Sequence, residues 1–203
     1  MLRILLIFSL CFGIASTAFT QSSVEHHVKV RSSEFLIHGS TNVSDYHCKL
    51  QESTNTDSLN IKRWWSNKTI TFQGLVLQYR VNQFDCGLEL MNQDLQVLLK
   101  SATYPYLSLQ INSIRIKEGK QQIEELLVSS DVTVNLAGST KNVSPIQGKV
   151  INHSESMLTL KGKTTLVMED FGIEPPVKFF GMVKVESELV VEFSITMEVT
   201  DLK

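Results

Sequence analysis

The chain has 203 residues, a net charge of −2 and 42% hydrophobic residues, and it contains three cysteines. Its acidic and basic side chains are interspersed without a basic patch, which argues against nucleic acid as a partner. The length suits one domain with a sizeable core, and we expect a single domain over residues 19–203.

The N-terminal residues have the order of a secretory signal peptide. Arg3 is followed by an apolar run at residues 4–14 and by small residues up to Ala18. We expect cleavage near Ala18, which removes residues 1–18 and makes the protein periplasmic or secreted. The alternative is a membrane anchor, but the apolar run is shorter than the ~20 residues that cross a bilayer. We therefore expect no transmembrane segment in the mature chain.

Export leaves two cysteines, Cys48 and Cys86, both in strand-like sequence. Disulfides persist in exported proteins, so we predict that the two residues bond to each other. The alternative is a pair of free buried thiols.

The segments after the leader alternate apolar and polar residues in short runs separated by turns, which is the pattern of β-strands. In chain order, we assign the first strands to residues 24–31, 33–38, 43–50, 68–78 and 79–90. The polar, turn-rich residues 51–60 are predicted to form an exposed loop.

One short helix is predicted next. Asn92 is placed to cap it, and Leu95, Leu98 and Leu99 fall on one face of its turns. Pro105 disfavours helical backbone at the residue before it, so the chain leaves the helix as an extended segment.

The remaining sequence continues as strands. Alternation at residues 107–116 slips at Asn112–Ser113, which predicts a bulge, and further strands are predicted at residues 123–136 and 141–150. The clearest alternation lies at residues 158–168 and 189–199, on both sides of a loop with a glycine and two prolines. Many strands, one short helix and no βαβ rhythm predict an all-β barrel or sandwich, and closure into a barrel removes unpaired edges.

The sequence lacks the spacing of a catalytic or metal centre. Asp170–Phe171–Gly172 matches a kinase tripeptide, but no glycine-rich loop or catalytic-loop pattern accompanies it. His26, His27, His38 and His47 lack metal-ligand spacing, and we expect His26 and His27 to be exposed. We assign no catalytic residue, no metal and no cofactor, and we expect a protein that is not an enzyme.

An exported barrel without catalytic residues has an apolar interior that can hold an apolar ligand. The candidate ligand-lining residues are the inward-facing apolar residues Leu109, Ile111, Leu160, Leu166, Val191, Phe193 and Ile195. The alternative is a filled barrel, a structural or interaction protein of the cell envelope that acts through outer loops such as residues 51–60. Leu and Val line pockets and fill cores equally well, so the pattern leaves both readings open.

Five short motifs, taken in order, resemble the YceI-like family of exported lipid- or polyisoprenoid-binding proteins. They are L-I-H-G-S-T-N-V-S-D-Y at residues 36–46, Cys86–Gly87 with Met91, K-S-A-T-Y-P at residues 100–105 after the helix, L-A-G-S-T-K at residues 136–141, and D-F-G-I at residues 170–173.

The resemblance implies a lipocalin-like antiparallel barrel of about eight strands, whose cavity takes up an isoprenoid chain such as that of a quinone. It also implies the periplasm of a Gram-negative bacterium. The usual Arg-Asp-x-His-Leu run before the helix is replaced here by the sequence that starts at Cys86, which places the chain in a divergent branch. No family motif fixes a binding residue, so the candidate residues rest on strand alternation alone.

Overall fold

The computed structural model describes residues 23–50, 58–117 and 125–201. The predicted signal peptide at residues 1–18 lies outside these ranges, as do residues 51–57 of the predicted loop.

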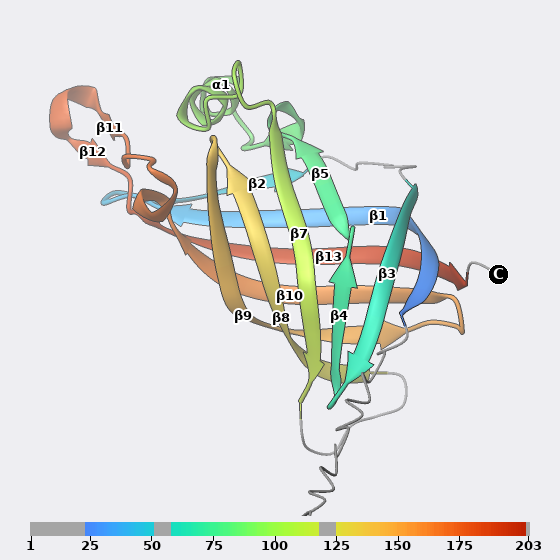
Figure 1. The fold of residues 1–203 in the computed structure, drawn as a ribbon. Helices are drawn as coiled ribbons and strands as arrows, with labels where there is room; N and C mark the ends of the chain where they lie inside the picture. Colours follow the sequence, from blue (N-terminus) through green and yellow to red (C-terminus); the bar gives the residue numbers. More distant parts are fainter. Residues whose placement is uncertain (1–22, 51–57, 118–124, 202–203) are drawn as a thin grey trace, which may run out of the picture.

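Eight antiparallel strands close into a barrel (Figure 1). Neighbours pair in the order β13, β10, β9, β8, β7, β4, β3 and β1, and β1 pairs with β13 to close the ring. These strands are β1 (Val24–Ser40), β3 (Ser58–Ser66), β4 (Thr69–Gln73), β7 (Tyr106–Ile116), β8 (Glu125–Leu136), β9 (Ser139–Asn152), β10 (Met157–Val167) and β13 (Glu188–Asp201). The predicted fold class, a lipocalin-like antiparallel β-barrel with one short helix, is confirmed.

The other elements gather around one end of the barrel, where helix α1 (Glu89–Leu98) lies (Figure 1). They are β2 (Asp45–Leu50), β5 (Val76–Arg80), β6 (Phe84–Asp85), the hairpin strands β11 (Val177–Lys178) and β12 (Val183–Lys184), and the 3-10 turns η1 (Val81–Gln83), η2 (Met168–Phe171) and η3 (Phe179–Gly181). β2 pairs with the last residues of β1, and β5 pairs with β7.

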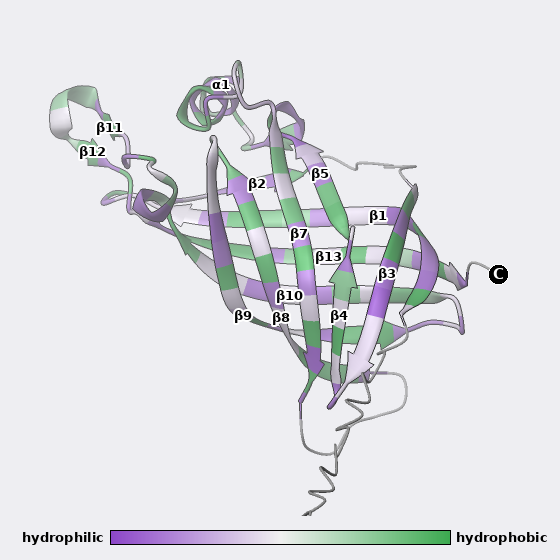
Figure 2. Ribbon diagram, viewed as in Figure 1, coloured by the Kyte–Doolittle hydropathy of each residue, from purple (hydrophilic) through white to green (hydrophobic). Residues whose placement is uncertain are grey.

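The barrel interior is built by the period-two alternation of its strands, visible as bands of hydropathy along β7 and β8 (Figure 2). Cross-strand partners on the inner face include Phe35 with Phe193 and Val30 with Met197. Both the start of β1 and the end of β13 lie at the end of the barrel away from α1, which we call the packed end. Val28 there is 1% exposed.

Bulges account for the interruptions in the sequence pattern. The register of β7 shifts between Ile111 and Ser113, as predicted. The two short strands predicted at residues 24–31 and 33–38 are one strand, β1, whose register shifts between Val30 and Ser32. The extra residue at a bulge shifts the alternation by one position, so the apolar residues after the bulge again face the interior. The strand therefore continues through the interruption in the sequence pattern.

Several element boundaries differ from the prediction. The predicted loop at residues 51–60 ends earlier, because β3 begins at Ser58. The two strands predicted at residues 68–90 are shorter pieces, divided at Gly74, whose φ of 88° suits a residue without a β-carbon.

The helix begins at Glu89 rather than beside a cap at Asn92. The Asn92 side chain instead binds the turn before the helix: its Oδ1 accepts the Cys86 N–H at 2.7 Å, and its Nδ2 donates to Asp85 Oδ1 at 3.2 Å.

His26 is buried, and its predicted exposure is wrong. It occupies an inner position of β1 at the packed end and is 1% exposed, whereas His27 points outward and its Nδ1 lies 2.9 Å from Asn60 Oδ1. The His26 Nδ1 is 2.7 Å from Asp201 Oδ1. Burial lowers the pKa of His26, the nearby Arg63 guanidinium lowers it further, and the Asp201 carboxylate opposes both.

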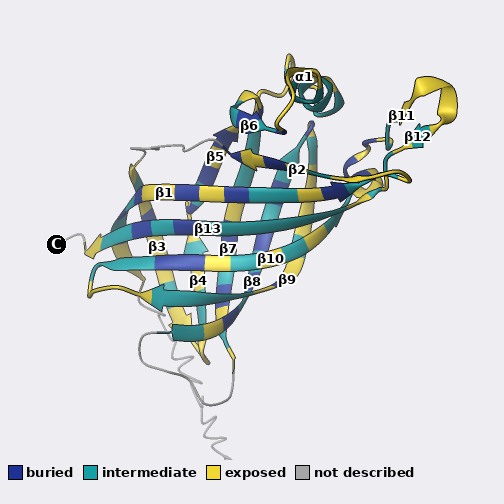
Figure 3. Ribbon diagram, turned by 180° about the vertical axis from the view of Figure 1, so that it is seen from behind, coloured by how far each residue is buried: buried dark blue, intermediate teal, exposed yellow. Residues whose placement is uncertain are grey.

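The β11–β12 hairpin leaves the barrel beside α1, and its tip is exposed (Figure 3). The Asn42 side chain, in the turn between β1 and β2, holds its base. Asn42 Nδ2 donates to the Met182 carbonyl at 2.9 Å, and Asn42 Oδ1 accepts the Lys184 N–H at 2.8 Å.

Candidate functional site

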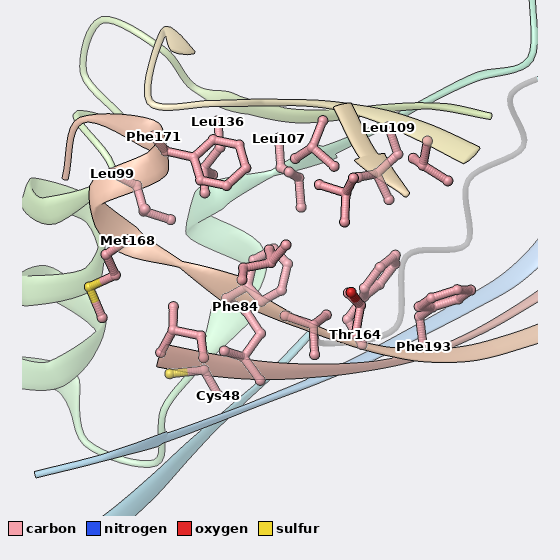
Figure 4. A pocket seen from close by; sticks show the side chains of 18 of the residues that line it. Cys48, Phe84, Leu99, Leu107, Leu109, Leu136, Thr164, Met168, Phe171 and Phe193 are labelled. Atoms are coloured by element: carbon pink, nitrogen blue, oxygen red, sulfur yellow. The ribbon is translucent and has the colours of Figure 1, made fainter. Parts of the chain in front are cut away.

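The barrel contains a cavity of about 130 Å³ at the end covered by α1 (Figure 4). Its wall is formed by inner-face side chains of β1, β7, β8, β9, β10 and β13. Along β13 the wall runs from Leu189 to Ile195 and ends before Met197. The cavity therefore occupies only part of the interior.

All seven candidate residues predicted from strand alternation lie in the wall of this one cavity. They are Leu109, Ile111, Leu160, Leu166, Val191, Phe193 and Ile195. They come from three strands, β7, β10 and β13, which are not all adjacent in the ring. Their contact with a ligand remains a prediction.

A cap covers the cavity, made of α1 and the segment at residues 168–173 that contains η2. From α1 and its C-cap residue, the side chains of Leu95, Leu98 and Leu99 line the cavity, which is the apolar face predicted from their spacing. Leu90 and Val97 lie on the exposed side of the same helix. One helix face thus closes the barrel and the other meets solvent.

The second part of the cap contains the Asp170–Phe171–Gly172 tripeptide. Phe171 is buried and lines the cavity together with Met168 and Ile173. Gly172 has φ 67° and ends the 3-10 turn, with its N–H donating to the Glu169 carbonyl at 2.9 Å. The tripeptide here is part of an apolar lid. Sequence reasoning placed it in a loop and missed its role in the wall.

Covalent and ionic links join the cap to neighbouring elements. Cys48 on β2 and Cys86, just before α1, form the predicted disulfide, and Cys48 also lines the cavity. Lys178 on the β11–β12 hairpin has its Nζ 2.7 Å from Asp94 Oδ1 on α1. The disulfide is the stronger constraint, because an exposed ion pair contributes about 0–1 kcal/mol.

The cavity wall carries no charged side chain among the residues that the structure describes. The residues of the wall that carry a hydroxyl group are Tyr46, Ser130 and Thr164. Burial raises the pKa of Tyr46 above its usual value, so this phenol is neutral at pH 7. A wall of this kind can remove apolar surface from water, but it offers no acid, base or ion ligand.

The described ranges contain no group of three or more His, Cys, Asp or Glu side chains that could hold a metal ion. Within the same ranges, no helix is long and apolar enough to span a membrane.

Comparison with known proteins identifies the fold. No family model and no curated protein sequence matches the chain. Among solved structures, a polyisoprenoid-binding domain from Saccharophagus degradans, implicated in plant cell wall breakdown, superposes with a TM-score of 0.58 at 13% identity. The match covers 87% of this chain and 99% of that domain.

Two further structures are similar at lower scores. BcnA from Burkholderia cenocepacia has a TM-score of 0.48 and 15% identity, over 81% of this chain and 95% of BcnA. A YceI protein from Campylobacter jejuni has a TM-score of 0.46 and 11% identity, over 65% of this chain and 74% of that protein. At these identities the likeness establishes the fold alone. The likeness to the polyisoprenoid-binding domain shows that the chain has the same barrel fold, and the family resemblance predicted from its motifs is confirmed at the level of the fold.

Proposed function

We propose that the protein is an exported, non-catalytic binding protein that holds an apolar lipid, an isoprenoid or quinone chain, inside its barrel. The observation that carries this proposal is the uncharged, almost wholly apolar wall of the cavity beneath α1. Each methylene buried in such a wall stabilises the complex by about 0.8 kcal/mol, so an apolar chain binds without a polar contact. The polyisoprenoid-binding domain with the same fold supports this ligand class.

The size of the cavity limits how the ligand enters. A volume of about 130 Å³ resembles that of an engineered apolar cavity of roughly 150 Å³ that binds benzene. We infer that one end of a lipid chain enters the cavity and that the rest of the lipid leaves beside the cap.

Export is proposed from two features. The Cys48–Cys86 disulfide fits an oxidising compartment, and the first 18 residues have the order of a signal peptide. The mature chain is then the single domain at residues 19–203, located in the periplasm or outside the cell.

The alternative, a barrel filled by its own side chains that acts through outer loops, is less well supported. It requires an interior without space for a ligand, whereas the α1 end is hollow. Most of its proposed loop, residues 51–57, lies outside the described ranges.

Native mass spectrometry of the mature protein purified from its own host tests the proposal. We expect a discrete added mass that disappears on denaturation. A bare polypeptide mass, unchanged after incubation with quinones and polyprenols, contradicts the proposal.

A matched pair of variants assigns the added mass to the cavity. Leu109→Trp places an indole in the cavity wall and is expected to abolish the adduct. Gln110→Trp adds the same side chain at the neighbouring exposed position of β7 and is expected to retain it.

A further inference from the structure

Four aromatic side chains from β1, β5, β6 and β13 form a cluster inside the barrel, in which Phe35, Phe84 and Phe193 line the cavity. Phe35 is its centre: the Phe35 ring centroid lies 4.8 Å from that of Tyr79, 6.5 Å from that of Phe84 and 6.2 Å from that of Phe193. Figure 4 shows Phe193 at the opposite end of the pocket from the cap residues Leu99 and Met168. We call these four residues the aromatic cluster.

Toward the packed end, the cavity wall on β13 continues past Phe193 only to Ile195, and buried core follows. Along β1 the cavity wall includes Ile37 and Phe35, and the next inner residue, Ser33, is buried outside the wall. The Ser33 and Tyr79 hydroxyl oxygens are 2.9 Å apart in a buried hydrogen bond. Burial raises the pKa of Tyr79 to about 12, so the phenol keeps its proton. Val30 and Met197 follow as buried core.

A glycine on the neighbouring strand leaves the space that the Phe193 ring occupies. Gly162 on β10 is the cross-strand partner of Phe193. A β-carbon at residue 162 would overlap the end of the Phe193 ring, so only glycine allows the ring to lie there. Among the inward-facing residues of β10, position 162 therefore has no side chain, and the Phe193 ring of β13 fills that space.

We propose that Phe193, seated over Gly162, sets the length of prenyl chain that the cavity accepts. The inference rests on the proposed function. The end of an isoprenoid chain enters from the cap end and stops at the Phe193 ring. Further isoprene units gain no buried contact there, since the described residues that follow, Val30 and Met197, are buried core.

The test is a series of prenyl alcohols of increasing length, namely prenol, geraniol, farnesol, geranylgeraniol and solanesol. Their affinities are measured by displacement of N-phenylnaphthylamine from the mature protein. For the wild type, affinity is expected to rise along the series and then reach a plateau. In Phe193→Ala the plateau is expected about one isoprene unit later. The first alcohol beyond the wild-type plateau gains about tenfold or more in affinity, because each buried methylene contributes roughly fourfold.

A compensating variant makes the test specific. Phe193→Ala with Gly162→Val refills the same space from β10 and is expected to return the plateau to its wild-type length. Val28→Ala, which removes core atoms at the packed end while the aromatic cluster stays in place, is expected to leave the plateau where it is. If Phe193→Ala fails to fold, Phe193→Leu opens less space and repeats the test.

The outcomes separate the two proposals. If the wild type binds the series but Phe193→Ala or Phe193→Leu has the same plateau, the length limit is wrong and the binding function stands. A wild-type affinity that keeps rising through solanesol overturns the length limit in the same way. If no variant and no wild-type sample binds any alcohol of the series, the proposed function and this inference both fall.

Discussion

Val134 and Val128 lie on the same face of β8, and both are buried, yet they meet different surroundings. Val134 lines the cavity beneath α1, whereas Val128 lies in the core beyond its wall. The strand alternation that turns both side chains inward is the same. The two valines differ in the elements that face them. A helix and a 3-10 turn cover the hollow end, whereas side chains of opposing strands meet at the packed end. The direction in which a side chain points is thus set locally by its strand, whereas the presence of a cavity depends on the whole barrel.

The largest effect is expected where the cap is joined to the barrel. Replacing both cysteines, in Cys48→Ala with Cys86→Ala, removes a crosslink between residues separated by 38 positions. The chain-entropy estimate for such a loop is about 4 kcal/mol of lost stability. The measurement is urea denaturation of the variant and of the wild type with and without a reductant. Equal unfolding free energies would show that the cap is held by packing alone.

The valine pair sharpens the comparison directly. Val128→Ala leaves a void in packed core and is expected to cost about 2 kcal/mol, since lost transfer energy and cavity formation add. Val134→Ala widens an existing cavity and is expected to cost about 1 kcal/mol, because little of the cavity term applies. Urea denaturation of both variants under one set of conditions gives the difference. Equal costs would mean that the α1 end is packed as tightly as the other.

A smaller, pH-dependent effect is expected from His26 at the packed end. Its pKa is lowered in the folded protein, so the folded state favours the neutral ring. An unfolded histidine titrates near pH 6.5, so the unfolded chain binds the proton first as pH falls. The stability contribution of neutral His26 is therefore present above about pH 6.5 and is lost progressively below it.

The control for that effect is His26→Gln, which cannot titrate. Unfolding free energies of both proteins at pH 8 and pH 5 are compared, so that effects of shared groups cancel. We expect the wild type to lose more stability than the variant between the two pH values. Parallel losses would contradict a neutral, buried His26.

Much of the fold follows from alternation because the pattern marks one face of each strand. It identified the inner residues of β7, β10 and β13 and the bulge in β7. β3 escaped notice because only Leu59 and Ile61 alternate before Lys62 and Arg63 interrupt the apolar pattern. Two apolar residues are too few to distinguish a strand from a polar loop.

The cap was the part of the site that the sequence reasoning missed. Leu95, Leu98 and Leu99 predicted an apolar helix face, but nothing in their spacing says which surface that face covers. The gap at Gly162 was a usable signal, since a glycine at an inner strand position indicates a close approach by another group. Identifying that group as Phe193 required the register of β10 against β13, which is a tertiary property.

The ring closes by pairing its first strand with its last. β1 ends at Ser40 and β13 begins at Glu188, so all six other barrel strands are translated between the two partners. A chain that emerges from the N-terminus exposes both edges of an open sheet until β13 arrives. The cavity has a complete wall only then, so the barrel can enclose a ligand only after the last strand has emerged.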